Sequence, residues 1–260
     1  MSTSLKTMFD LSGRTALVTG GSRGLGLTMA EALGEFGATI VLTARKQHEL
    51  DAAVEHLAGL GITAHAFAAD VGNPETPQTV VDAVKALGLH IDILVNNAGT
   101  SWGSKTEEMP LDAWNKLMAV NLTGPFLMAQ VIAREFMIPA GWGRIVNIAS
   151  VEGLLGHHPR MIGTLAYNSS KGGLVNFTRA LAAEWAPLGI TVNALAPGYF
   201  PSKLTGYVID THGAELIADT PRGKLGCDDD LKGATLLLSS DAGAHITGQV
   251  LPVDGGATII

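Results

Sequence analysis

Tyr167 and Lys171 stand four residues apart in the segment LAYNSSKGGLVNFTRALAAEW, residues 165–185. The segment has helical spacing, so one turn places the phenol and the ammonium on the same face. A free phenol has a pKa of about 10, and a neighbouring ammonium lowers it by favouring the phenolate. Such a phenol can exchange a proton with a carbonyl or alcohol oxygen. A surface Lys beside a half-buried Tyr is the alternative, because this spacing also arises by chance.

A second feature with chemical meaning is the glycine-rich stretch TGGSRGLG at 19–26. It follows an apolar run and opens a segment with helical spacing at 24–37. Glycines allow a tight turn and close approach to a pyrophosphate, and the helix N-terminus holds the negative charge. A glycine turn without a ligand is the alternative, but its place at the first strand–helix junction favours dinucleotide binding. The residues assigned to this function are Gly20, Ser22, Arg23, Gly24, Leu25 and Gly26.

The end of the second apolar run, LTARK at 42–46, bears on the choice of cofactor. Chains that bind NAD usually place an acidic residue there, which accepts from the ribose hydroxyls. This chain has Thr43, Ala44 and Arg45 instead, and Arg23 lies in the glycine turn. Two guanidinium groups suit a 2′-phosphate, although both could be ordinary surface charges. We therefore predict NADP(H) rather than NAD(H) as the cofactor.

The elements that must position these residues alternate along the chain. Helical segments at 24–37, 48–61, 79–87, 111–137 and 165–186 are interleaved with apolar runs at 14–20, 38–44, 62–70, 91–99, 143–150, 189–198 and 248–256. Strands that are apolar throughout are buried on both faces, which indicates a parallel sheet covered by helices. We predict one α/β domain over residues 1–260, with a single Rossmann-type doubly wound parallel sheet of about seven strands and helices on both faces.

Composition excludes several classes of function. The net charge of −7 argues against a nucleic-acid surface. Cys227 is the one cysteine in the sequence, so we expect no internal disulfide, no cysteine-based metal site and a cytoplasmic location. Residues 1–14 lack the apolar centre of a signal peptide, and Gly, Pro or charge interrupts every apolar run of membrane-spanning length. We expect neither a metal nor a membrane partner.

The ordered motifs resemble those of the short-chain dehydrogenase/reductase family, near its gluconate 5-dehydrogenase and beta-ketoacyl reductase groups, over essentially the whole chain. The motifs are TGGSRGLG, Asp70, NNAG (96–99), NLTG (121–124), IVNIAS (145–150), YNSSK (167–171) and APGYF (196–200). Each is weak alone, but seven in order are specific. The resemblance implies an NADP(H)-dependent oxidoreductase that interconverts a ketone and a secondary alcohol by hydride transfer.

The same resemblance implies catalytic roles for four residues. Tyr167 would be the general acid/base, and Lys171 would lower its pKa and donate to the nicotinamide ribose. Ser150 would donate to the substrate oxygen and stabilise a developing alkoxide. Asn121 would complete a proton relay through a water beside Lys171, although a buried helical Asn often only satisfies backbone groups.

Further cofactor contacts are implied by the resemblance. Asp70 and Val71 would flank the adenine, although Asp70 could also simply cap a strand end. A nearby group would line the cleft, namely Asn97, Ala98 and Gly99. Another group would border the nicotinamide and its carboxamide or pyrophosphate, namely Pro197, Gly198 and Ser202.

Two segments bear on the substrate. The gap between Ser150 and Tyr167 is a few residues longer than is usual in the family. Its polar residues could contact an anionic or polyhydroxylated substrate, although we favour a solvated loop tip; they are His157, His158 and Arg160. Residues 199–217 are expected to form a mobile lid over a partly apolar pocket, with side chains from Tyr199, Phe200, Leu204, Tyr207 and Ile209.

The apolar lid favours a keto-acyl or other hydrophobic ketone substrate. A sugar-acid dehydrogenase of the gluconate type is the alternative, and epimerisation or dehydration on the same fold also stays open. A catalytically silent dinucleotide-binding sensor is a weaker alternative, because Ser150, Tyr167 and Lys171 are all present. We also predict a homotetramer, because two helical regions carry apolar residues on more than one face, including Leu117, Val120, Phe126, Phe177, Leu181 and Trp185.

Overall fold

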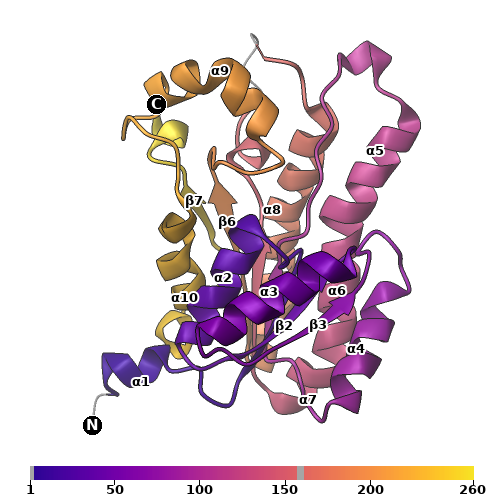
Figure 1. The fold of residues 1–260 in the computed structure, drawn as a ribbon, viewed down its shortest axis with the longest axis vertical. Helices are drawn as coiled ribbons and strands as arrows, with labels where there is room; N and C mark the ends of the chain where they lie inside the picture. The colour runs from indigo at the N-terminus through magenta and orange to yellow at the C-terminus, as the bar shows by residue number, and fades with distance from the viewer. Residues whose placement is uncertain (1–2, 157–160) are drawn as a thin grey trace.

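A computed structural model describes residues 3–156 and 161–260 of the chain. Within these residues, seven parallel strands form one sheet in the order β3-β2-β1-β4-β5-β6-β7. This confirms the predicted parallel sheet of about seven strands, and Figure 1 shows how it lies among the helices. The strands are β1 (Thr15–Thr19), β2 (Thr39–Ala44), β3 (Ala64–Ala68), β4 (Ile93–Asn96), β5 (Gly143–Ile148), β6 (Ile190–Pro197) and β7 (Val250–Val253). The strand order reverses between β1 and β4, and sheets of this kind bind ligands beyond the carboxyl ends of the strands at such a point.

Helices connect the strands and cover both faces of the sheet (Figure 1). They are α1 (Leu5–Phe9), α2 (Gly24–Glu35), α3 (Gln47–Gly59), α4 (Thr76–Ala86), α5 (Leu111–Met118), α6 (Gly124–Ile132), α7 (Ile138–Ala140), α8 (Leu165–Trp185), α9 (Gly206–Ala218) and α10 (Lys232–Ser239). The sequence predicted no separate helix at α1, α9 or α10. Of these, α9 occupies most of the segment that we expected to form a lid.

The core includes two large apolar clusters, one on each face of the sheet, and a third, smaller one. Along β1, Ala16 and Val18 join the cluster under α2, α3 and α10, whereas Leu17 joins the cluster under α4, α6 and α8. This alternation arises because successive side chains of a strand point to opposite faces. Burial on both faces explains why the three central residues of β1 are all apolar.

The longest helical region runs from Leu111 to Ala140, where α5, α6 and α7 are joined by π-helical turns at Ala119–Thr123 and Ala133–Met137. By length and composition alone it could cross a membrane, with a mean hydropathy of 1.3 over its most apolar window, of which 50% is buried in the fold. It packs against β4, α4 and α8. These contacts account for its apolar composition without a membrane.

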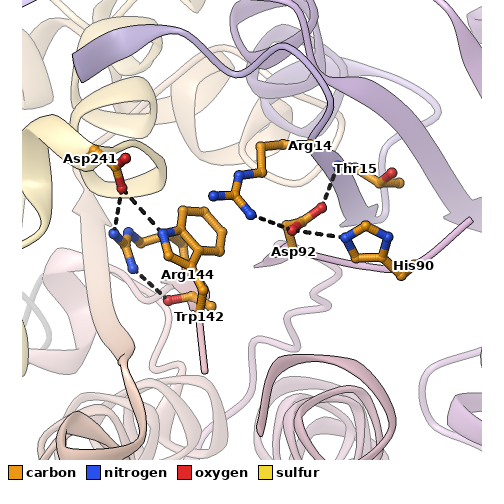
Figure 2. A network of polar contacts seen from close by, with 8 residues as sticks. Arg14, Thr15, His90, Asp92, Trp142, Arg144 and Asp241 are labelled. Carbon is orange, nitrogen blue, oxygen red and sulfur yellow. Dashed lines mark hydrogen bonds and ion pairs between the residues drawn. The ribbon is translucent and has the colours of Figure 1, made fainter. Parts of the chain in front are cut away.

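A polar cluster joins the amino ends of β1 and β4, at the opposite end of the sheet from the ligand-binding edge (Figure 2). Asp92, which is 3% exposed, accepts from the guanidinium of Arg14 and the backbone N–H of Thr15, both at 2.9 Å. His90 lies 3.0 Å from the same carboxylate. A buried carboxylate is thereby satisfied by several donors, as burial of a charge requires.

The same end of the sheet holds a second ion pair around Trp142 (Figure 2). The guanidinium groups of Arg14 and Arg144 lie 3.8 and 4.2 Å from the centroid of the Trp142 ring. Arg144 also pairs with Asp241 at 2.9 Å, and that carboxylate accepts from the Trp142 indole at 3.2 Å. Burial lowers the pKa of Arg144, so the ring and the carboxylate together replace the water that the cation loses.

Candidate active site

The residues that could take part in catalysis lie at or near the carboxyl ends of the central strands. Ser150 follows β5 by two residues and is 7% exposed. Tyr167 lies in the first turn of α8, a helix that packs along β6. Ser150 and Tyr167 both line a cavity of about 310 Å³. The fold therefore places a hydroxyl and a phenol on the wall of a space that suits a small substrate.

Lys171 is buried beside Tyr167, one helical turn further along α8. Its ammonium donates to the carbonyl oxygen of Ile148 at 2.7 Å and lies 5.7 Å from the centroid of the Tyr167 ring. Burial lowers the pKa of Lys171 to about 8, because the protein interior solvates an ammonium less well than water does. The structure therefore confirms that the phenol and the ammonium share a helix face.

The pKa of Tyr167 differs from the sequence-based expectation. Burial raises the pKa of Tyr167 to about 12, while a hydrogen bond with Ser150 lowers it and the charge of Glu152 raises it. We predicted that the Lys171 ammonium would lower this pKa. Burial is instead the largest influence on the pKa of Tyr167, because it disfavours the phenolate. The phenol is therefore protonated at neutral pH, as a proton donor must be.

Asn121 lies in the π-helical turn Ala119–Thr123 and is fully buried. Its side-chain oxygen accepts from the N–H of Thr100 and its amide donates to the Thr100 carbonyl, both at 2.9 Å. The amide also donates to the hydroxyl of Ser170 at 3.0 Å. Asn121 thus joins the loop after β4 to α8, one residue before Lys171. Its proton-relay role stays a prediction.

Sequence reasoning missed Glu152, which lies two residues after Ser150. Its carboxylate accepts from the hydroxyl of Tyr199 at 3.0 Å and from the amide of Asn168 at 2.6 Å. Its backbone N–H donates to the Ser150 hydroxyl oxygen at 3.2 Å. Burial and the Glu152 charge raise the pKa of Tyr199. An acidic residue so close to Ser150 was the available signal that a carboxylate would face the cavity.

The cavity is lined by both apolar and polar side chains. Many of the apolar ones come from the segment before α8 and from the segment that includes α9, namely Met161, Ile162, Leu204, Tyr207 and Val208. The polar side chains include those of Ser150, Glu152, Tyr167, Tyr199 and His212. Phe200, which we expected to line this pocket, is instead 2% exposed and belongs to the core. Ile209 is also absent from the lining among the residues that the structure describes.

The glycine turn has the shape that a dinucleotide pyrophosphate needs. Gly20 and Gly24 have φ of +65° and +52°, which residues with side chains rarely adopt. A Cβ on Gly20 would lie 2.9 Å from the Cα of Ala98, and one on Gly26 would collide with the Gly20 carbonyl. A Cβ on Gly24, at the N-terminus of α2, would meet open space. The next residue, Leu25, packs against the core. The turn therefore fits a phosphate group held by backbone N–H groups.

The two arginines assigned to the cofactor lie on neighbouring junctions. The N–H of Gly20 donates to the Thr43 carbonyl at 2.7 Å, which joins the glycine turn to the end of β2. Arg45 is exposed two residues further on. Arg23 precedes α2, and its Nε lies 3.8 Å from Glu49 in α3. The structure therefore places both guanidinium groups at the same edge of the sheet.

A carboxylate that sequence reasoning did not consider lies at this edge. Glu49 accepts from Lys46 at 3.1 Å, and its other oxygen is 3.5 Å from the Ser22 hydroxyl. The hydrogen bond from Lys46 holds the pKa of Glu49 below its usual value, although burial acts in the opposite direction. Glu49 is therefore charged at neutral pH and is surrounded by donors.

The remaining cleft residues follow β3 and β4. Asp70 accepts from the N–H of Gly72 at 3.0 Å, so it also fulfils the local turn role that we considered. Val71, which is 9% exposed, follows it. The amide of Asn97 donates to the Thr19 carbonyl at 2.9 Å and so holds the loop after β4 against the glycine turn. These residues therefore lie just beyond the carboxyl ends of β3 and β4, and their contact with a cofactor stays a prediction.

At Gly99, the loop after β4 lies close to two of the proposed catalytic residues. A Cβ on Gly99 would lie 3.6 Å from the Asn121 side-chain oxygen and 3.7 Å from the Lys171 ammonium. The glycine turn, the loop at Asn97–Ala98–Gly99 and the Tyr167–Lys171 pair therefore form one continuous site.

On the other side of the site, Pro197 ends β6 and Gly198 lines the cavity. The N–H of Gly198 donates to the Val253 carbonyl at 3.0 Å. Ser202 lies 2.9 Å from the hydroxyl of Thr205 in the turn before α9. This hydrogen bond orders the turn, and a contact of Ser202 with a cofactor stays a prediction.

The other polar candidates lie outside the described residues or form no site. His157, His158 and Arg160 belong to the four residues, 157–160, that the structure does not describe. Within residues 3–156 and 161–260, no three His, Cys, Asp or Glu side chains gather closely enough to hold a metal ion. A phenol and a hydroxyl at a cavity, next to a cleft shaped for a dinucleotide, can support proton transfer coupled to hydride transfer.

Comparisons with known proteins agree with this geometry. Residues 14–212 match the family model described as short chain dehydrogenase. Gluconate 5-dehydrogenase of Gluconobacter oxydans is 40% identical over 257 residues, which are 97% of this chain and 97% of that protein. The 3-oxoacyl-(acyl-carrier-protein) reductase of Aquifex aeolicus is 36% identical over 95% of this chain and 98% of its own length.

A solved structure of similar sequence extends the comparison. A gluconate 5-dehydrogenase from Burkholderia cenocepacia, in complex with NADP and tartrate, has a TM-score of 0.93 against this chain at 37% identity. The match covers 99% of this chain and 100% of the other. The likeness therefore extends over the whole fold as well as the motifs.

Proposed function

The chain belongs to the short-chain dehydrogenase/reductase family and is an oxidoreductase, and we propose that Tyr167 is its proton-transfer group. The observation that carries this proposal is the convergence of Ser150 and Tyr167 on one cavity, with Lys171 buried beside the phenol. In the direction of reduction, the Ser150 hydroxyl donates to the substrate carbonyl oxygen. The Tyr167 phenol then gives its proton to that oxygen, and a secondary alcohol results.

A bound nicotinamide dinucleotide supplies the hydride in this direction and accepts it in the reverse one. Lys171 holds a positive charge beside Tyr167 and so limits the cost of forming a phenolate. Asn121 orders the Thr100 backbone beside this pair and takes part in returning the proton through a water. The burial that raises the pKa of Tyr167 favours its role as the acid, because a neutral phenol keeps its proton until the substrate oxygen gains charge.

The cofactor in this proposal is NADP(H). Support comes from the positions of Arg23 and Arg45 at the junctions after β1 and β2, and from the absence of an acidic residue at 43–45. The similar gluconate 5-dehydrogenase was crystallised with NADP. Asp70 and Val71 contact the adenine side of the cleft in this assignment. The turn and loop residues contact the phosphates and the nicotinamide.

The substrate in this proposal is a keto-acyl compound or another ketone with a hydrocarbon part. The apolar side chains that line the cavity, which include Met161, Leu204 and Val208, support this class. The polar groups of Glu152 and Tyr199, which line the cavity, support the alternative, a sugar acid or a similar hydroxylated substrate. These groups can exchange hydrogen bonds with hydroxyls next to the reacting carbon.

The assembly in this proposal is a cytoplasmic homotetramer. Phe126 remains 41% exposed and packs edge to face against Phe177, with ring centroids 6.3 Å apart. The edge strand β7 exposes 41% of Leu251, and an edge strand of this kind needs a cover. Two surfaces related by two twofold axes would give a tetramer. Leu117, by contrast, is 1% exposed and serves the chain's own core.

A substrate panel tests the proposed function. Beta-ketoacyl thioesters, keto-sugar acids and aromatic ketones are each mixed with the enzyme and NADPH, and the loss of nicotinamide absorbance is followed. Turnover of the first or third class supports the main proposal, and turnover confined to the second supports the sugar-acid alternative. Cofactor binding without any turnover across a broad panel would favour the sensor. Molecular mass by light scattering at micromolar concentration tests the tetramer, and a monomer would contradict it.

A further inference from the structure

The Glu49 carboxylate is approached by hydrogen-bond donors from two separate strand–helix junctions. Ser22 and Arg23 belong to the turn after β1, and Lys46 belongs to the turn after β2. All three approach the Glu49 carboxylate, with the Ser22 hydroxyl at 3.5 Å, the Arg23 Nε at 3.8 Å and the Lys46 ammonium at 3.1 Å. A hydroxyl and two cations that converge on one point form an anion site, and here the chain fills that site with its own carboxylate.

The exposure of the three charged side chains shows that this arrangement can open. The Glu49 side chain is 24% exposed, whereas those of Arg23 and Lys46 are 53% and 55% exposed. Exposed ion pairs contribute little to stability, because water competes for both partners. The two cations can therefore turn from Glu49 towards an incoming anion without disturbing the core.

We propose that Glu49 competes with the 2′-phosphate of the cofactor for Ser22, Arg23 and Lys46 and thereby weakens the preference for NADP(H) over NAD(H). This inference rests on the NADP(H) site proposed above. A 2′-phosphate that reaches these donors must displace the carboxylate and then lie close to its negative charge. A cofactor with a free 2′-hydroxyl brings no such charge, so it escapes this repulsion.

The test compares Glu49→Gln with the wild type, because glutamine keeps the size of the side chain and removes only its charge. Isothermal titration calorimetry measures the dissociation constants of 2′,5′-ADP and 5′-AMP, two fragments that differ in the 2′-phosphate. Glu55→Gln is the matched control, because Glu55 lies exposed on the same helix α3. Neither fragment reports on catalysis, so the measurement is independent of the substrate.

We expect Glu49→Gln to bind 2′,5′-ADP about five- to thirty-fold more tightly than the wild type, the range for like charges about 5 Å apart at a partly exposed site. Binding of 5′-AMP should change less than about twofold, and Glu55→Gln should resemble the wild type. The gain should shrink as salt is raised, because salt screens the repulsion.

Unchanged or weaker binding of 2′,5′-ADP by Glu49→Gln would overturn the inference, since Glu49 would then be neutral or would position the donors. Failure of the NADP(H) proposal looks different. In that case the wild type itself binds 5′-AMP at least as tightly as 2′,5′-ADP, whatever the effect of the substitution at Glu49.

Discussion

Lys171 donates a hydrogen bond of 2.7 Å to the carbonyl oxygen of Ile148, the last residue of β5. The contact joins the helix that carries Tyr167 to the strand that ends two residues before Ser150. The buried Lys171 ammonium therefore helps to hold Ser150 and Tyr167 at a set distance from each other, and it also places a positive charge beside Tyr167. Substitutions at Tyr167 and at Lys171 should consequently have different effects.

Replacing Tyr167 with Phe should leave cofactor binding intact and remove nearly all turnover. The substitution deletes only the phenol oxygen and its proton, and a general acid typically contributes about 10²–10⁴-fold to the rate. Steady-state kinetics on the substrate found by the panel gives the loss in kcat. The dissociation constant of NADPH serves as the control for folding. A variant that retained most of its activity would show that another group transfers the proton.

Replacing Lys171 with Met should change how stability depends on pH. The pKa of Lys171 is about 8 in the folded protein and 10.5 ordinarily. Between these values the unfolded chain binds the proton that the folded chain has lost. The free energy of unfolding of the wild type therefore rises with pH there, by up to about 3 kcal/mol, and below pH 8 the full cost of burying the charge is present.

Urea unfolding of the wild type and Lys171→Met at pH 7.5, 8.5 and 9.5 measures this contribution. The difference between the two proteins isolates Lys171, because every other titrating group is common to both. Lys116→Met, at an exposed position of α5, is the matched control. If the stability difference between wild type and Lys171→Met stayed constant over this range, the low pKa of Lys171 would be wrong.

Replacing Arg45 with Asp should reverse the cofactor preference or reduce it strongly. The change removes an attractive charge and places a repulsive one against a 2′-phosphate. A lost charge-assisted hydrogen bond costs roughly 1.5–3 kcal/mol, so NADPH should bind at least about tenfold more weakly. NADH should lose less or gain, because the new carboxylate can accept from ribose hydroxyls. Dissociation constants of both cofactors decide the matter, and an unchanged ratio would remove Arg45 from the site.

Much of the fold could be predicted because its signals are local. The apolar run at 14–20 contains β1, because the centre of a strand buried on both faces is apolar on both faces. Gly20 lies in the turn that follows β1, and Gly24 and Gly26 lie in the first turn of α2. The helix α9 was not predicted as such. Its only buried residue is Leu216, so the segment carries little of the periodic apolar signal that a core helix shows.

The parts of the site that escaped prediction depend on contacts between distant residues. Glu49 and Ser22 are 27 residues apart, and Glu152 and Tyr199 are 47 apart. No spacing rule links such pairs, because only the fold brings them together. The pKa of Tyr167 was misjudged for the same reason. Burial, which raises it, comes from the whole surroundings, whereas the four-residue spacing to Lys171 reports only the nearest charge.

Replacing Asp92 with Ala should destabilise the protein without changing its chemistry. Asp92 accepts from the N–H of Thr15 at 2.9 Å and from Arg14 at 2.9 Å, and it is 3% exposed. Loss of the carboxylate leaves the buried N–H of Thr15 without its acceptor, which costs about 1–3 kcal/mol. Arg14 has a side chain that is 35% exposed and also contacts Trp142, so water and the ring offset part of its loss.

The expected decrease in the free energy of unfolding is therefore about 2–3 kcal/mol for Asp92→Ala. Asp92→Asn should lose about half as much, because its amide oxygen can still accept from Thr15. Urea unfolding at pH 7 measures both, and kcat should stay within about twofold of the wild type because this cluster lies at the opposite end of the sheet from Tyr167. A loss below about 1 kcal/mol for Asp92→Ala would mean that water reaches the Thr15 N–H and replaces the carboxylate there.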